Sequence, residues 1–381
     1  MLEKLTHDTY SFSIGLGGFH LISSNGNGRV DMKAVKGINN ANVLVTSVGG
    51  LVAPGIIENL RRIPGVSRIV GVDASSDAIG FFMVDKSYVV PRGDENGYMD
   101  VLWSIIKAES VNLIIPASDE EVLTLSKYKD SFEEKGIVVL CSPFDITSNA
   151  IDKGCMLTFL KERDFPVANF SLPQTKNQLA MGAEELGYPE KPVIVKPRLG
   201  RGGRGVVVLK ENVEVLHTRG IRELKLEWFL NVIPEDEIPG VVLMEYLPGD
   251  EYSVDVLADR GNTLFIVPRK RIKAILGPSQ LGEVIWNEEV VNMVVPLVKL
   301  FRFDSIVNIQ LKYSYDGKPL VTEINPRISG TIVASAAAGV NLLQEGIRHA
   351  LGLKPSIAPM TKPRPTKMIR YLKEHFEGES Q

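Results

Sequence analysis

Apolar and polar residues alternate with a period of two through residues 305–327, on both sides of Asp316 and Gly317. An Asp-Gly pair between two alternating runs predicts a β-hairpin with a tight turn. Because the side chains of a strand point alternately to its two faces, one face of this hairpin is apolar. We expect that face to pack on a core. The residues on it are Val307, Ile309, Leu311, Leu320 and Ile324.

The other face of the hairpin carries acid and amide oxygens. A turn centred on the Asp-Gly pair places Gln310 opposite Glu323 and Asn308 opposite Asn325, with Lys312 on the same face. Oxygen ligands on a rigid pair of strands suit Mg²⁺, which keeps several waters and takes further ligands from nucleotide phosphates. A half-exposed hairpin with a polar outer face and no ligand is the alternative interpretation.

Short β-branched runs alternate with helical patterns between residues 41 and 145. We predict strands at 42–47, 67–72, 88–90, 112–115 and 137–140, and helices at 54–62, 97–109 and 119–135. This alternation predicts an α/β domain with a Rossmann-like parallel sheet. Gly49 and Asp119 follow two of these strands, where such sheets bind small molecules. Simple tight turns would explain both residues equally well, and the full glycine fingerprint of dinucleotide binding is absent.

A glycine-rich loop joins two predicted strands, at 193–196 and 206–209. It contains Arg201 and the glycines Gly200, Gly202, Gly203 and Gly205, and Lys196 ends the strand before it. Backbone amides of such a loop can approach phosphates closely. The loop is not a Walker motif, because no Gly-Lys-Ser/Thr sequence or helix follows. A flexible loop with solubilising arginines is the alternative.

Basic residues gather at 268–273, among them Arg269 and Arg271. They fit a solvated strand end, or they neutralise an anionic substrate or a transferring phosphate. Ser329 precedes an alanine-rich helix predicted at 332–338, and a helix N-terminus attracts anions. Strand-end position and charge make a candidate acceptor site of five residues: Gly49, Asp119, Arg269, Arg271 and Ser329.

Composition narrows the class of protein. The chain has 381 residues, 44% of them hydrophobic, and a net charge of −3, which favours two or three domains and gives no general signal for nucleic acid or an anionic membrane. No apolar run reaches the ~18 residues of a membrane helix. The two cysteines have neither metal-site nor disulfide spacing. With no signal-peptide pattern at the N-terminus, we expect a soluble, cytoplasmic protein without a nucleic-acid or membrane partner.

Five separated motifs occur in a characteristic order. They are Lys153 on a helix, Lys196 on a strand, the glycine loop, Glu245-Tyr246-Leu247 followed by Glu251, and the Gln310 strand paired with Glu323-Ile-Asn-Pro-Arg327. This order resembles the ATP-grasp superfamily, and most closely one synthetase half of the carbamoyl-phosphate synthase large subunit. The resemblance covers about residues 41 to 350.

The resemblance implies a two-lobed ATP-grasp module with antiparallel sheets after the Rossmann-like domain. The expected organisation is an N-terminal extension (1–40), a pre-ATP-grasp domain (41–145), a lid subdomain with a linking helix (146–245), a C-terminal lobe with the metal site (246–355) and a peripheral tail (356–381). Residues 1–40 could form a hairpin or a loose extension.

The resemblance also implies a role for each matching residue. ATP would contact Lys153, Lys196, the loop residues Gly200, Arg201, Gly202, Gly203 and Gly205, the hinge Glu245, Tyr246 and Leu247, and Glu251 on the ribose. The magnesium ligands would be Gln310, Glu323 and Asn325, with one or two Mg²⁺ ions, or Mn²⁺ as an alternative. Arg327 would stabilise the transferring phosphate and the acylphosphate, assisted by Lys196 and Asn325.

Two features depart from the carbamoyl-phosphate pattern. Lys153 and Lys196 stand where those relatives carry arginine, whereas biotin carboxylases and peptide-forming ligases use lysine; the tandem second half and a glutaminase segment are missing. We therefore expect an ADP-forming ligase that activates a small carboxylate for attack by an amine or similar nucleophile. A bicarbonate-activating, carbamoyl-phosphate-synthase-like enzyme and a non-catalytic ATP-binding regulator are the alternatives. The assembly is left open, with a homodimer as one alternative.

Overall fold

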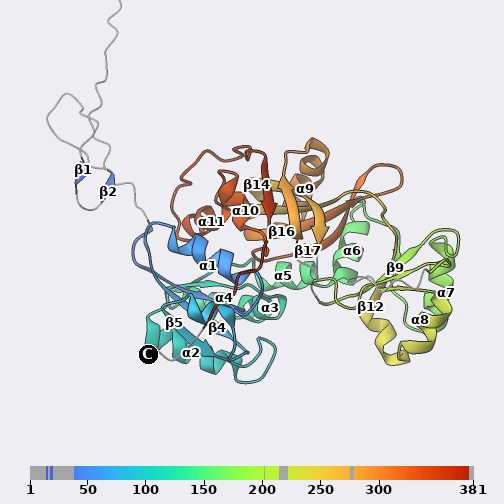
Figure 1. Ribbon diagram of the computed structural model, residues 1–381, viewed down its shortest axis with the longest axis horizontal. Coiled ribbons are helices and arrows are strands. Elements are labelled where there is room, and N and C mark those ends of the chain that lie inside the picture. The colour runs from blue at the N-terminus through green and yellow to red at the C-terminus, as the bar shows by residue number, and fades with distance from the viewer. Residues whose placement is uncertain are drawn as a thin grey trace, which may run out of the picture.

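The computed structural model describes residues 14–15, 18–19, 38–200, 202–213, 222–274 and 279–376 (Figure 1). Three sheets organise the chain between residues 38 and 376. Near the N-terminus, β1 (Ile14–Gly15) and β2 (Gly18–Phe19) form a short antiparallel pair. The remainder of the predicted hairpin or extension over residues 1–40 lies almost entirely outside the described residues.

A parallel five-stranded sheet in the order β5-β4-β3-β6-β7 confirms the predicted α/β domain. Its strands are β3 (Ala41–Val45), β4 (Val66–Asp73), β5 (Lys86–Val89), β6 (Leu113–Ile115) and β7 (Val138–Val139). Its helices are α1 (Ala53–Arg61), η1 (Ile79–Phe82), α2 (Tyr98–Glu109), α3 (Asp119–Lys127) and α4 (Lys129–Glu133). The single helix predicted at 119–135 is wrong, because Tyr128 leaves helical geometry and divides it.

The second sheet lies at the far side of the molecule, in the segment that we predicted as the lid (Figure 1). Its order is β11-β10-β9-β12-β8, with β8 (Phe170–Ser171), β9 (Val193–Pro197), β10 (Val207–Leu209), β11 (Arg222–Leu224) and β12 (Val241–Glu245). It packs with α7 (Lys176–Glu185), α8 (Leu226–Val232) and η2 (Glu235–Gly240). Residues 222–224 pair in parallel with β10, and the helix α8 begins only at Leu226.

An antiparallel six-stranded sheet, in the order β17-β16-β13-β14-β15-β18, forms the C-terminal lobe. Its strands are β13 (Glu251–Asp259), β14 (Asn262–Ala274), β15 (Ser279–Val284), β16 (Ser305–Tyr313), β17 (Pro319–Asn325) and β18 (Thr366–Ile369). Around it lie α5 (Phe144–Ile151), α6 (Lys153–Lys161), α9 (Glu288–Phe301), α10 (Val333–Ala337) and α11 (Leu342–Ala350). No helix among the described residues has the length and apolar character needed to cross a bilayer.

The described part of the predicted peripheral tail (356–381) contributes one edge strand to the fold. The strand β18 pairs with β15 at the edge of the six-stranded sheet. Beyond it, Arg370 donates to the Gly330 carbonyl at 2.8 Å, and His375 stacks on Phe82 of the N-terminal domain. Tyr371, Leu372 and Phe376 remain exposed.

The register of the central hairpin confirms the predicted cross-strand pairs. β16 pairs with β17 so that Gln310 faces Glu323 and Asn308 faces Asn325. A β-bulge follows Gln310, and it shifts the remaining pairs by one residue. Val321, rather than Leu320, therefore takes the buried position beside Leu311, which corrects the predicted apolar face.

Candidate active site

The polar face of the hairpin presents four side chains with oxygen atoms toward the centre of the molecule. Gln310 and Glu323 are partly exposed, whereas Asn308 and Asn325 are buried. All four line one cavity. The strand pairing fixes their backbones, so that their carboxylate and amide oxygens are held on one rigid surface.

Lys153 lies across from this surface at the start of α6. Its Nζ is 3.7 Å from a Glu323 oxygen and donates to the Gly200 carbonyl at 3.0 Å. Asp152 caps the helix by accepting from two backbone amides and also pairs with Arg198 at 2.9 and 3.0 Å. The cap therefore fixes both the helix that carries Lys153 and the strand end that leads into the glycine loop.

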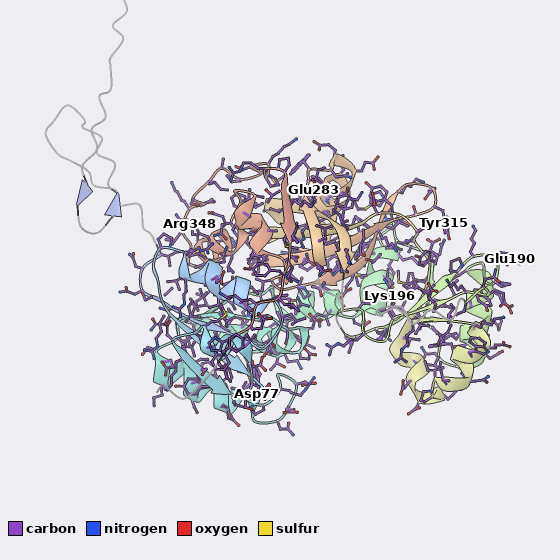
Figure 2. All side chains as sticks on the ribbon, viewed as in Figure 1. Asp77, Glu190, Lys196, Glu283, Tyr315 and Arg348 are labelled. Carbon is purple, nitrogen blue, oxygen red and sulfur yellow. The ribbon has the colours of Figure 1, made fainter. Side chains whose placement is uncertain are left out.

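Lys196 lies on β9 of the lid, half-buried, and faces the C-terminal lobe (Figure 2). Burial lowers its pKa to about 8, although Glu323 acts to raise that pKa and Lys153 acts to lower it further. An amine with this pKa binds a proton more strongly once an anion arrives beside it. A phosphate beside Lys196, between the two lobes, would therefore raise the pKa of this lysine.

The described part of the glycine loop has the conformation that glycine permits. Gly200, Gly202, Gly203 and Gly205 all have positive φ angles, and a Cβ on Gly205 would lie 2.8 Å from the Pro197 ring. Gly202 and Arg204 line the same cavity as the hairpin face. Arg201, which we predicted to contact ATP, lies outside the described residues.

The chain crosses from the lid sheet to the six-stranded sheet between residues 245 and 251. Glu245 is tied to Asn169 by two hydrogen bonds of 2.8 and 2.9 Å, and Leu247 is buried. Tyr246 packs under Lys312, whose Nζ lies 4.8 Å from the ring centroid. These contacts give the predicted hinge a fixed geometry at the edge of the space between the lobes.

Glu251 and Arg271 form an ion pair of 2.5 Å on neighbouring strands of the six-stranded sheet. Arg271 also donates to the Gln310 oxygen at 3.3 Å. We expected Arg271 in the acceptor site, yet its partners belong to the predicted ribose and metal positions. It lines the cavity at that end.

Arg327 is buried where the C-terminal lobe meets the N-terminal domain. Its guanidinium donates to Asp119 at 2.6 Å, to Asn325 at 3.0 Å and to the Ile328 carbonyl at 3.1 Å. Burial acts to lower the pKa of Arg327, but the charge of Asp119 raises it above its ordinary value. Arg327 is therefore a permanent cation that ties the two domains together beside the hairpin face.

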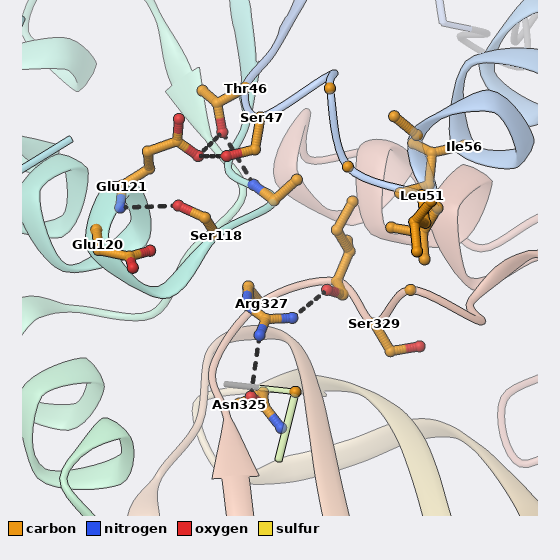
Figure 3. A pocket seen from close by; sticks show the side chains of 18 of the residues that line it. Thr46, Ser47, Leu51, Ile56, Ser118, Glu120, Glu121, Asn325, Arg327 and Ser329 are labelled. Carbon is orange, nitrogen blue, oxygen red and sulfur yellow. Dashed lines mark hydrogen bonds between the residues drawn. The ribbon is translucent and has the colours of Figure 1, made fainter. Parts of the chain in front are cut away.

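A cavity of about 640 Å³ runs from the hairpin face to the carboxyl ends of the parallel strands (Figure 3). On the C-terminal side, Figure 3 shows Arg327 near Asn325 and Ser329. Across from them lie Glu121 and the two hydroxyl residues after β3, and Leu51 and Ile56 form an apolar side.

The structure brings together part of the predicted acceptor site. Gly49 and Ser329 line the cavity, whereas Asp119 contacts the lining residue Arg327. Ser329 does not cap a helix as predicted, because α10 begins at Val333 and has no side-chain cap. The helix is also too short to offer an anion site of its own.

The structure does not place Arg269, which we predicted as an acceptor residue, in the cavity lining. It is fully buried on the same face of the sheet as the polar hairpin residues, where it donates to Asp255 at 2.9 Å and to Ser253 at 2.9 Å. Asn308 donates to the same two side chains at 2.8 and 2.9 Å. Arg269 thus fixes the side chains next to the hairpin face.

Sequence reasoning missed the hydroxyl and acid network of the N-terminal domain. Thr46 and Ser47 donate to the buried carboxylate of Glu121 at 2.5 and 2.9 Å, and Thr46 also accepts from the Ala117 amide at 3.0 Å. Thr46 and Ser47 end the strand predicted at 42–47, and Glu121 lies three residues after the helix cap Ser118. The position of Thr46 and Ser47 at the end of a predicted strand was the sequence signal that could have identified this network.

The donor set of the hairpin face fits a magnesium ion. It offers the oxygens of Glu323, Gln310 and Asn325 without nitrogen or sulfur ligands, as Mg²⁺ prefers. Lys153 lies 3.7 Å from Glu323, and Arg271 donates to Gln310 at 3.3 Å, so two cations border these oxygens. The same oxygens could therefore satisfy a divalent cation bound together with phosphates.

Two family models match this chain. One is described as an ATP-grasp in the biosynthetic pathway with Ter operon and matches residues 237–374. The other is described as a PylC-like N-terminal domain and matches residues 43–140. The first match contains the whole hairpin, and the second contains nearly the whole parallel sheet.

Similar proteins share the fold at low identity. The arginine-specific large chain of carbamoyl phosphate synthase from Halalkalibacterium halodurans is 26% identical over 276 residues, which is 68% of this chain and 24% of that protein. This chain thus spans about a quarter of the length of that relative. We therefore do not assign the substrates of that relative to this chain.

Among solved structures, the N5-carboxyaminoimidazole synthetase of Staphylococcus aureus complexed with ADP has a TM-score of 0.66 at 15% identity, covering 88% of this chain and 83% of that one. The biotin carboxylase domain of the Hydrogenobacter thermophilus 2-oxoglutarate carboxylase, with MgADP and bicarbonate, has a TM-score of 0.64 at 19% identity, covering 85% and 72%. The family matches and the curated relative together show that residues 237–374 match an ATP-grasp family model and that the chain resembles one half of a carbamoyl phosphate synthase large chain.

Proposed function

We propose that the protein is an ATP- and magnesium-dependent ligase that converts a carboxylate into an acylphosphate and then joins it to an amine or similar nucleophile. One observation carries this proposal. The oxygen-bearing hairpin face and the permanently charged Arg327 line one cavity that continues into a second domain, and Lys153 lies 3.7 Å from Glu323 of that face. Such a cavity has room for phosphates and an acceptor side by side.

The first step depends on neutralising the charge of the phosphates rather than on a covalent bond to the protein. A carboxylate oxygen attacks the γ-phosphorus while the bond to the β-phosphate bridging oxygen breaks, and ADP leaves. In our proposal Lys196 and Lys153 bind the phosphates, and Arg327 stabilises charge on the transferring group. One or two Mg²⁺ ions, or Mn²⁺, held by Glu323, Gln310 and Asn325 would offset the phosphate charge.

The second step releases phosphate. The amine nitrogen attacks the acyl carbon, the carbon–oxygen bond to phosphate breaks, and the nitrogen loses a proton. Closure of the glycine loop, which lines the cavity through Gly202 and Arg204, would exclude water from the acylphosphate. No protein nucleophile is required, and we assign none.

The test is ADP release with a panel of carboxylates and amines, with Mg²⁺ and with a chelator. We expect release only with Mg²⁺, and we expect Glu323→Gln and Lys196→Ala each to lower it by roughly a hundredfold. Glu58→Gln, an exposed acid of α1, is the matched control and should keep full activity. Unchanged ADP release in both site variants would refute the proposal.

Bicarbonate as the activated acid is a second candidate. It is favoured by the similarity to carbamoyl phosphate synthase large chains and to a biotin carboxylase domain whose structure contains bicarbonate. Dependence of ADP release on added bicarbonate, in buffers stripped of carbon dioxide, separates this candidate from the first. An organic carboxylate that supports release without bicarbonate would exclude it.

We also propose a domain organisation and an oligomeric state. Residues 41–145 would form the acceptor-side domain, 146–245 the lid with its linker, and 246–355 the lobe with the metal site. The linker helices α5 and α6 pack on the six-stranded sheet of that lobe. The biotin carboxylase domain named above is described as a dimer. A homodimer is our proposal here too, and light scattering of the purified chain tests it.

A further inference from the structure

One asparagine of the hairpin face has its side-chain amide fixed in a single orientation. Asn308, on β16, is only 2% exposed and lines the cavity. Its Nδ2 donates to the Asp255 carboxylate at 2.8 Å and to the Ser253 hydroxyl at 2.9 Å, so both hydrogens of that nitrogen are used. The reversed orientation would place the amide oxygen against a carboxylate oxygen, which like partial charges oppose.

Buried partners hold the two acceptors of Asn308 in place. Asp255 and Arg269 are both fully buried, and the guanidinium donates to the carboxylate at 2.9 Å. Arg269 also donates to the Ser253 hydroxyl at 2.9 Å. Because a buried charge that loses its partner is strongly destabilising, this network resists rearrangement. It therefore fixes the direction of the Asn308 side chain.

The oxygen of this amide is available to the cavity. Among the described residues, Oδ1 of Asn308 has no hydrogen-bond partner, and it is not one of the fully enclosed polar atoms that lack a partner. The oxygen is therefore accessible from the cavity that Asn308 lines. Polar atoms at such buried positions are seldom left unpaired, so we expect a group in the cavity to contact this oxygen.

A cation suits this oxygen better than an anion does. An amide oxygen only accepts hydrogen bonds, so it offers an anion nothing. In metal sites, a carboxylate often accepts the outer N–H of a ligating histidine, which orients that ligand and makes it more basic. Asp255 accepts the N–H of Asn308 in the same manner, at 2.8 Å. Amide and carboxylate oxygens are also the ligands that Mg²⁺ prefers.

The neighbouring oxygens of the hairpin face are bordered by guanidinium groups. Oδ1 of Asn325, which faces Asn308 across the strands, accepts from Arg327 at 3.0 Å. Gln310, two residues along β16 from Asn308 and thus roughly 7 Å away, accepts from Arg271 at 3.3 Å. Asn308 therefore adds an oxygen that is fixed in direction and has no cation as its partner among the described residues.

We propose that the amide oxygen of Asn308 is a further ligand of the divalent cation at the hairpin face. Asp255, Arg269 and Ser253 are positioning residues that direct this oxygen. The inference extends the predicted ligand set of Gln310, Glu323 and Asn325, and it rests on the proposed function only for the presence of a divalent cation at this face. It requires neither an identified carboxylate nor an identified nucleophile.

The test is titration of the purified chain with Mn²⁺ in the presence of ADP, with free Mn²⁺ followed by electron paramagnetic resonance. We expect Asn308→Leu, which is similar in size but has no oxygen, to weaken Mn²⁺ binding by roughly tenfold or more. Ser253→Ala should weaken it by a smaller factor, because Asp255 still holds the amide. Asn292→Leu, at an exposed position of α9, is the matched control and should bind Mn²⁺ like the unchanged protein.

Two measurements distinguish a ligand from a residue that only supports the fold. Thermal melts show whether each variant is folded. ADP affinity in the presence of a chelator should be the same in all variants, because the metal is then removed from the measurement. Glu323→Gln is the reference for loss of a ligand of the hairpin face. If Asn308→Leu does not fold, Ser253→Ala decides, and an unchanged Mn²⁺ affinity in that variant overturns the inference.

The outcomes separate this inference from the proposed function. An unchanged Mn²⁺ affinity in Asn308→Leu, with a loss in Glu323→Gln, overturns the inference and leaves the ligase proposal intact. Absence of Mn²⁺ binding to the unchanged protein with ADP also overturns it. If Mn²⁺ binding depends on Asn308 as expected but ADP is never released with any carboxylate, the inference stands and the ligase proposal fails.

Discussion

Lys196 offers a quantitative test, because burial lowers its pKa to about 8. At pH 7 roughly nine-tenths of this lysine is protonated, and at pH 9 roughly one-tenth. If only the charged lysine binds the phosphates of ATP, the affinity for MgATP falls about tenfold between these two pH values, which is roughly 1.4 kcal/mol. The direction follows from the sign of the shift: the binding-competent charge is present below the pKa and is lost above it.

The assay is calorimetric titration of MgATP from pH 6.5 to pH 9.5. Near pH 8 the binding should also take up protons, so that the measured enthalpy depends on the ionisation enthalpy of the buffer. Lys196→Arg keeps its charge over the whole range and should remove this pH dependence. Lys107→Arg, on the exposed surface of α2, is the control and should bind like the unchanged protein.

An MgATP affinity that stays constant between pH 7 and pH 9 would refute the reasoning. So would a Lys196→Arg variant that loses affinity with rising pH as steeply as the unchanged protein. In the first case Lys196 either keeps an ordinary pKa or does not contact phosphate. In the second case another group titrates in the same range.

Three further predictions follow from the contacts around the site. Arg327→Lys should lower kcat for ADP release by roughly a hundredfold while MgATP affinity stays within about threefold, because a lysine cannot reproduce the guanidinium geometry; steady-state kinetics and calorimetry measure the two effects. Asp152→Ala should lower the free energy of unfolding by roughly 2 kcal/mol in urea denaturation, since it removes a helix cap and the partner of Arg198. Arg269→Met should lower it by roughly 3–5 kcal/mol in the same assay, because it leaves the buried Asp255 without its cation.

Each of these predictions can fail in a specific way. A kcat that does not change in Arg327→Lys would remove that residue from the reaction centre. Asp152→Asn preserves a capping oxygen, so it should be milder than Asp152→Ala; equal losses would show that the cap is not responsible. Full stability of Arg269→Met would mean that the buried charges are not coupled as the contacts indicate.

The hairpin could be predicted because its information is local. The Asp-Gly pair locates the turn, but the pairs next to it, such as Lys312 with Leu320, differ by one residue from the predicted register. The bulge after Gln310 could not be predicted, since Thr322 has the character of an ordinary strand residue. It restores the predicted pair of Gln310 and Glu323, while on the turn side Val321 rather than Leu320 is buried.

The acceptor half of the site depends on contacts that no local pattern contains. Glu121 meets Thr46 from 75 positions away along the chain, and Arg327 meets Asp119 from 208 positions away. The position of residues at strand ends therefore identified Gly49 but not the network of Thr46, Ser47 and Glu121. It also misplaced Arg269, because a basic residue in a basic segment gives no local sign that it is buried and paired.

The central claim is that ATP phosphorylates a carboxylate in the cavity beside the hairpin. The most direct measurement uses a carboxylate that supports ADP release, with its carboxylate oxygens replaced by a heavy isotope. The inorganic phosphate that forms is then analysed by mass spectrometry. We predict that one heavy oxygen passes from the carboxylate to each phosphate, because the acylphosphate bond to carbon is the one that breaks. Phosphate that carries no heavy oxygen would contradict the account.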